Sequence, residues 1–165
     1  MRSGLIAATA LLFASGAAQA EDTDRCWPGN VCASAPKTVM DALAKAELAP
    51  VMGEDSLGDP RITVEYDGWT FAVLFYGCVE NENCDSLQFS IVFEDDGNNT
   101  LELANAWNAA KRFGQLSVGP KNELQLSYDL ATIGGVNEQN FIDVLSWWVT
   151  MLAELADFFE ERGLV

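Results

Sequence analysis

The 165-residue chain contains no histidine, and its 9 lysine and arginine residues are outnumbered by 25 aspartate and glutamate residues. Without histidine, the chain cannot form Ser-His or Cys-His nucleophile pairs or the common catalytic zinc sites. The net charge of −16 argues against DNA or RNA as a partner, because phosphate binding needs many cationic side chains. We therefore expect a non-enzymatic protein with no cofactor, metal site or nucleic-acid partner.

What the chain does contain is typical of a globular protein, with 49% hydrophobic and 10% aromatic residues and a length that suits one domain. Residues 1–20 resemble a secretory signal peptide: Arg2 is basic, residues 5–18 are apolar, and Ala18-Gln19-Ala20 fits the A-x-A cleavage pattern. The alternative is an uncleaved anchor, which the short, alanine-rich run disfavours. We expect a periplasmic or secreted mature chain without a membrane span.

Four cysteines follow as two pairs with the same spacing, Cys26 with Cys32 and Cys78 with Cys84. In an oxidising compartment an even number of cysteines favours disulfides, and four cysteines allow three pairings. Local geometry favours Cys26–Cys32, around a Pro-Gly turn, and Cys78–Cys84, at the mouth of a hairpin. Zinc and thiol redox sites are disfavoured because they prefer C-x2-C spacing.

Hydrophobic periodicity divides the mature chain into an arm, residues 21–35, and a single domain, residues 36–161. Turn signals fill residues 51–60. The elements expected in chain order are a helix from 36, strands at 62–66, 69–76 and 87–93, a helix from 100, strands at 116–118 and 124–130, and a helix at 137–161. This α-β-β-β-α-β-β-α order predicts an α+β domain with a five-stranded antiparallel sheet.

The element order is similar to that of type III secretion chaperones, and several motifs resemble the YbjN family of bacterial sensory transduction regulators. The most specific motif is Asn105-x-Trp107-Asn108-x-x-Lys111-Arg112-Phe113-Gly114. Weaker matches are Asp55-x-x-Gly58-Asp59-Pro60, the segment from Phe71 to Cys78, Leu87-Gln88-Phe89, and Gly135-Val136 with the tryptophan-rich last helix. The resemblance implies a chaperone-like fold and a regulatory or chaperone-like protein-binding role without an active site.

Within the specific motif, Lys111 and Arg112 form an adjacent basic pair that could contact an acidic partner. The alternative is that they complement the dipole at a helix C-terminus. Trp107 could anchor a partner, but its position on an apolar stripe favours core packing. Trp147 and Phe158 complete the candidate interaction surface, because they widen the apolar face of the last helix.

The last helix also carries Ile142, Val149 and Met151 beside its main stripe, more apolar surface than one sheet face readily covers. Either the N-terminal segment or a second subunit, as in a homodimer, would have to cover the rest.

An alternative function is small-ligand or cation binding by acidic loops, residues 80–83 and 94–99. An EF-hand-type loop starting at Asp95 would need a glutamate at position 106, where the chain has Ala106. Solvated turns are the simpler interpretation of both loops.

Overall fold

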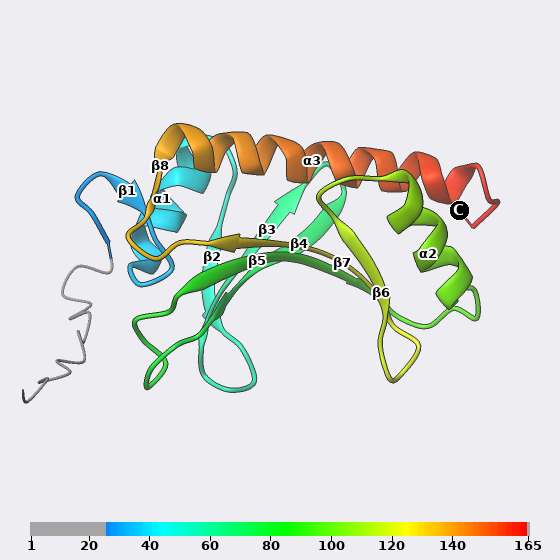
Figure 1. The fold of residues 1–165 in the computed structure, drawn as a ribbon, viewed down its shortest axis with the longest axis horizontal. Coiled ribbons are helices and arrows are strands. Elements are labelled where there is room, and N and C mark those ends of the chain that lie inside the picture. The colour runs from blue at the N-terminus through cyan, green and yellow to red at the C-terminus, as the bar shows by residue number, and fades with distance from the viewer. Residues whose placement is uncertain (1–25, 165) are drawn as a thin grey trace, which may run out of the picture.

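Most of the chain forms one antiparallel sheet with its helices on a single face (Figure 1). The computed structural model describes residues 26–164, so the predicted signal peptide lies outside the described part. The elements in chain order are β1 (Asn30–Val31), α1 (Pro36–Lys45), β2 (Val51–Glu54), β3 (Pro60–Tyr66), β4 (Trp69–Tyr76), β5 (Ser86–Phe93), α2 (Leu101–Ala110), β6 (Gln115–Val118), β7 (Leu124–Ala131), β8 (Val136–Asn137) and α3 (Glu138–Glu160).

The sheet has six strands in the order β2-β3-β4-β5-β7-β6, so the α+β prediction is correct and the five-strand prediction is wrong. The additional strand is β2, which lies in the segment expected to be only a turn. It is four residues long and exposed throughout, so it has no burial pattern to reveal it in the sequence. Its ladder with β3 pairs Val51 with Thr63 and Glu54 with Pro60.

The longest helix, α3, crosses the middle of the sheet and supplies most of the core. Trp148 is fully buried, with its ring centroid 5.7 Å from Phe71 on β4 and 5.8 Å from Phe89 on β5. Phe141 and Phe159 extend this aromatic packing toward the two ends of the helix. The predicted apolar stripe of the last helix is therefore the face that binds the sheet.

The rest of the apolar surface of α3 is mostly covered within the chain. Met151 and Phe158 are buried, and Ile142 and Val149 pack partly against the core. Trp147 alone among these side chains is exposed. None of the helices in the described part is long and apolar enough to cross a membrane.

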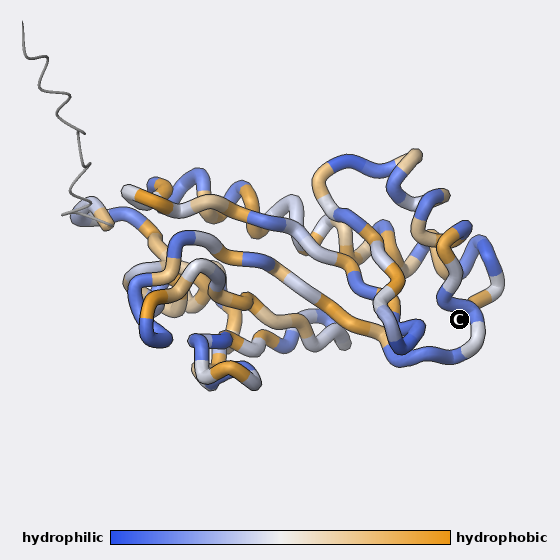
Figure 2. Tube along the Cα trace, turned by 60° about the horizontal axis from the view of Figure 1, so that its bottom comes forward, coloured by the Kyte–Doolittle hydropathy of each residue, from blue (hydrophilic) through white to orange (hydrophobic). Residues whose placement is uncertain are grey.

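The opposite face of the sheet carries no helix (Figure 1). Along β4, Phe71, Val73 and Phe75 are buried toward α3, whereas Thr70 and Tyr76 are exposed on the other face. Figure 2 shows the resulting alternation of hydrophilic and hydrophobic positions along the strands. One covered and one solvated face is the usual arrangement for an antiparallel sheet.

The two disulfides have the pairing favoured by local geometry, Cys26–Cys32 and Cys78–Cys84. The first holds a short segment whose β1 pairs with β8. Residues 21–35 were expected to lie outside the core, but Val31, Cys32 and Ala33 are buried. The reason is that β1 pairs with β8, just before α3, and contacts both α1 and α3.

Two loops and the N-terminal segment are joined at the disulfide-bonded end of the sheet. The buried Thr132 hydroxyl accepts a hydrogen bond from Ala33 N (2.9 Å) and donates one to the carbonyl of Asp85 (3.1 Å). In the loop closed by Cys78–Cys84, the Asn81 amide donates to Leu57 O (3.0 Å) and to Asp59 Oδ1 (2.9 Å). That loop therefore also supports the turn between β2 and β3.

Of the helices α1, α2 and α3, the last two begin with a side-chain N-cap. Thr100 and Asn137 accept hydrogen bonds from the backbone N–H groups of Leu103 and Asn140, as N-cap side chains do. At α1 the N-cap residue is Ala35, which has no capping side chain, and the Ser34 hydroxyl is buried without a hydrogen-bond partner among residues 26–164.

We predict that Thr132→Val lowers the free energy of unfolding by about 1–3 kcal/mol, because the buried Ala33 N–H loses its acceptor. Urea unfolding measures the loss. Thr70→Val, an exposed position on β4, is the control and should change stability by less than about 0.5 kcal/mol. Equal stability of the two variants would contradict a structural role for this hydroxyl.

Candidate docking surface

The most specific motif of the sequence serves first to attach α2 to the sheet. Trp107 is fully buried, and its indole N–H donates a hydrogen bond to the carbonyl of Gly114 (2.9 Å). Its ring meets Phe158 of α3 edge-on, with the centroids 5.3 Å apart. Both side chains belong to the core, so neither can form part of an interaction surface in this conformation.

The next residue of the motif seals an edge of the sheet. The side chain of Asn108 donates to Leu116 O (2.8 Å) and accepts from Leu116 N (2.9 Å), as a neighbouring strand would. Gly114, which leads into β6, is needed because a Cβ there would lie 2.5 Å from Met151 Sδ. The backbone of β6 is thus occupied by α2 and cannot add another strand at this point.

The other predicted residues, Lys111, Arg112 and Trp147, lie together with Phe113 on one side of the molecule; we call these four residues the aromatic–basic surface. Phe113 and Trp147 stack with centroids 4.8 Å apart and planes 37° apart. Both are exposed, Phe113 by 41% and Trp147 by 42%. The four residues line a depression of about 250 Å³ between the end of α2 and the middle of α3.

The two cations of this surface differ in their partners. Lys111 forms an ion pair with Glu154 of α3 (3.1 Å) and lies 5.7 Å from the centre of the Trp107 ring. The Arg112 guanidinium lies over Phe113, 4.8 Å from its ring centre, and has no acidic partner among residues 26–164. Lys111 therefore mainly ties α2 to α3, whereas Arg112 is available to a carboxylate of a partner.

Phe113 was not among the residues predicted to form the interaction surface, although it belongs to the most specific motif of the sequence. Phe113 has a left-handed backbone conformation (φ 68°), which turns the chain between α2 and β6. A large aromatic residue rarely adopts this conformation, so the fold fixes the ring where it can meet Trp147 and Tyr128. The basic pair preceding it was the available signal.

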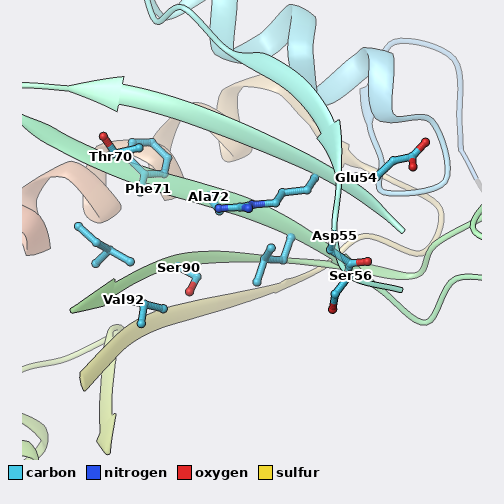
Figure 3. Close-up of a pocket in the computed structure, with 11 residues that line it drawn as sticks. Glu54, Asp55, Ser56, Thr70, Phe71, Ala72, Ser90 and Val92 are labelled. Carbon is cyan, nitrogen blue, oxygen red and sulfur yellow. The ribbon is translucent and has the colours of Figure 1, made fainter. Parts of the chain in front are cut away.

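A second concavity lies on the uncovered face of the sheet, beside the turn between β2 and β3 (Figure 3). It measures about 470 Å³ and is lined by hydroxyl, aliphatic and acidic side chains together with Arg61. Farther along this face, Gln88 donates to Asp129 (2.8 Å) and Gln125 donates to Ser90 (2.9 Å). These contacts satisfy the amides within the sheet.

Tyr76 stands at one end of the same face. Partial burial raises the pKa of the Tyr76 hydroxyl above its usual range, and the carboxylates of Asp129 and Asp55 act in the same direction. The phenol therefore stays neutral near pH 7 and has no perturbation suited to acid–base catalysis there.

In the acidic loop at residues 94–99, two aspartates bond to the backbone of the same loop. Asp95 and Asp96 accept hydrogen bonds from the N–H groups of Gly97 and Asn98, both at 2.9 Å. The bonds from the Asn98 backbone and side chain also lower the pKa of the Asp96 carboxyl. The described residues contain no cluster of three or more metal-ligating side chains.

The family model YbjN, described as "Putative bacterial sensory transduction regulator", matches residues 35–161, which is most of the chain. The chain belongs to the YbjN family. A solved structure titled "Crystal structure of YbjN, a putative transcription regulator from E. coli" is similar with a TM-score of 0.52 at 18% identity, covering 78% of this chain and 90% of that chain. That likeness shows a shared fold. No curated protein matches the chain in sequence.

We predict that Asn108→Ala destabilises this YbjN-family protein by about 1–3 kcal/mol, because the substitution leaves both backbone groups of Leu116 without their amide partner. Chemical unfolding measures the loss. Asn105→Ala, on an exposed position of the same helix, is the matched control. If both variants unfold at the same denaturant concentration, Asn108 does not secure the edge.

Proposed function

We propose that the chain is an exported, non-catalytic regulatory module that binds a protein partner on the aromatic–basic surface, a chaperone-like role in which it holds another protein. The observation that carries this proposal is the exposed stack of Trp147 on Phe113. Tryptophan and arginine are the residue types most enriched among binding hot spots, and the depression beside them can receive an apolar side chain.

The chemistry of the surface narrows the kind of partner. Its aromatic rings suit an aliphatic or aromatic anchor, and Arg112 suits a carboxylate next to that anchor. The surface lies on rigid elements, since Lys111 is tied to Glu154 and the motif is held by Trp107. Little ordering would therefore be needed on this side when a partner binds.

We predict that Trp147→Ser weakens partner binding at least about thirtyfold, the range of a strong hot spot, while the fold is retained. A photo-reactive group placed at position 150 in the complete mature chain captures and identifies the partner, and titration of that partner measures the affinity. Trp27→Ser is the control, because Trp27 is a more exposed tryptophan of this chain, 60% exposed. A partner bound equally well by both variants would place docking elsewhere.

Export is the second part of the proposal. Both cysteine pairs are closed in disulfides, which suits an oxidising compartment outside the cytoplasm. We predict that the protein recovered from its producing bacterium begins at Glu21 and fractionates with periplasmic or secreted proteins. Intact-mass measurement of the fractions checks both statements. A cytoplasmic protein that keeps residues 1–20 would contradict export.

A further inference from the structure

The two edge strands of the sheet differ in how their outward backbone groups are covered. At β6, the Asn108 amide occupies the backbone of Leu116. At β2, all four residues are exposed, and among residues 26–164 no strand pairs with the outer side. Val51 and Met52 on this edge are 65% and 41% exposed. An uncovered edge with apolar residues is a place where another strand can add.

The register identifies which backbone groups of β2 face outward. Asp55 N donates to Asp59 O (2.9 Å), which continues the ladder between β2 and β3. Hydrogen-bonded pairs alternate along an antiparallel ladder, so Val51 and Gly53 turn their N–H and C=O groups toward β3. Pro60, opposite Glu54, fits this alternation because it has no N–H to donate. The outward groups therefore belong to Met52 and Glu54.

The length of this edge is limited on both sides. Pro50 precedes β2 and offers no N–H, and the turn at residues 55–58 follows it. A long partner strand would find only two residues to pair with. A partner strand with two outward-facing residues, one on either side of a central residue, can use every outward backbone group of this edge. The strand β2 itself has this arrangement, with Met52 and Glu54 on either side of Gly53.

We infer that β2 pairs antiparallel with β2 of a second copy of this chain, with the two Gly53 residues facing each other. In this register Met52 of each copy forms a hydrogen-bonded pair with Glu54 of the other, so four outward N–H groups meet four carbonyls. The Glu54 carboxylates lie beside methionines rather than beside each other. The inference does not depend on the aromatic–basic surface.

In the proposed pairing, Gly53 lies at the two-fold axis, where the two copies approach closely. Facing residues of a non-hydrogen-bonded pair approach closely, with Cα atoms about 4.5 Å apart. Gly53 has ample space around it, because a Cβ there would meet only Arg61 O at 3.9 Å. Position 53 can thus accept a cysteine and report the register directly through a disulfide between copies.

Charge and area make this a weak dimer. The full chain has a net charge of −16, and removal of residues 1–20 takes away only the basic Arg2, so two copies repel each other at low salt. Raising the ionic strength from about 0.01 M to about 0.1 M shortens the Debye length from about 30 Å to about 10 Å. A four-residue strand buries far less than the ~800 Å² per partner of a standard interface. Dimerisation should therefore increase with both protein concentration and salt.

The first test is sedimentation velocity on the mature protein and on Met52→Pro. Proline removes only an outward N–H and is tolerated on a free edge, so the variant should fold with an unchanged melting curve. We expect the wild type to show a reversible dimer that salt strengthens, and Met52→Pro to weaken it at least about tenfold. A monomer at every concentration, or a dimer that Met52→Pro leaves intact, overturns the pairing.

The second test is disulfide trapping. Gly53→Cys should form a covalent dimer in air, whereas Val51→Cys, an exposed control on the same face of β2, should not, because the register places it opposite Asp55 of the other copy. Peptide mapping must show the new cysteine joined to itself. Equal trapping of both variants, or Gly53→Cys joined to a different protein in cell extract, overturns self-pairing.

Discussion

The packing of Trp148 against Phe71 and Phe89 is the contact on which the rest of the fold depends. It fixes α3 across the middle of the sheet, and α1 and α2 then fill the space at its two ends. The Trp148 indole N–H is buried without a hydrogen-bond partner among residues 26–164, which costs about 1–3 kcal/mol. Burying so large a ring repays about as much or more, and the two aromatic contacts add to it. The position therefore favours tryptophan for its volume and not for its polar group.

The helices cover one face of the sheet, and its two edge strands, β2 and β6, need separate cover. The motif around Trp107 and Asn108 closes one of these edges: the Trp107 indole N–H bonds to the carbonyl of Gly114, and the Asn108 amide occupies the backbone of Leu116 on β6. The residues that make the motif recognisable in the sequence are thus largely structural. Arg112 and Phe113 are the part of the motif that lies outside the core, and Phe113 stacks on Trp147 of α3.

The sequence predicted those elements whose burial is periodic. The strands around Phe71, Phe89 and Leu126 and the whole of α3 could be located because their apolar residues alternate or recur. It missed β2, where no residue is buried, and the pairing of β1 with β8, where each strand has two residues. The candidate site was predicted only in part for the same reason: Lys111, Arg112 and Trp147 lie on the surface, whereas Trp107 and Phe158 are buried. Periodicity cannot tell which side of a wide apolar helix faces solvent, so Phe158 and Trp147 looked alike.

The strong acidity gains a physical role from the uncovered edge. A short strand with exposed Val51 and Met52 would be prone to indiscriminate pairing in a neutral protein, and acidic chains of like charge keep one another at a distance. Most lysines of the described part are already committed to neighbours, Lys37 to Asp41, Lys45 to Glu138 and Lys111 to Glu154. The 25 acidic residues outnumber the 9 basic ones, so the chain keeps a large negative charge that acts at long range. In the function proposed above, short-range recognition belongs to Phe113 and to Arg112, whose guanidinium has no acidic partner among residues 26–164. Repulsion then sets how often two molecules meet, and local fit decides which of those encounters last.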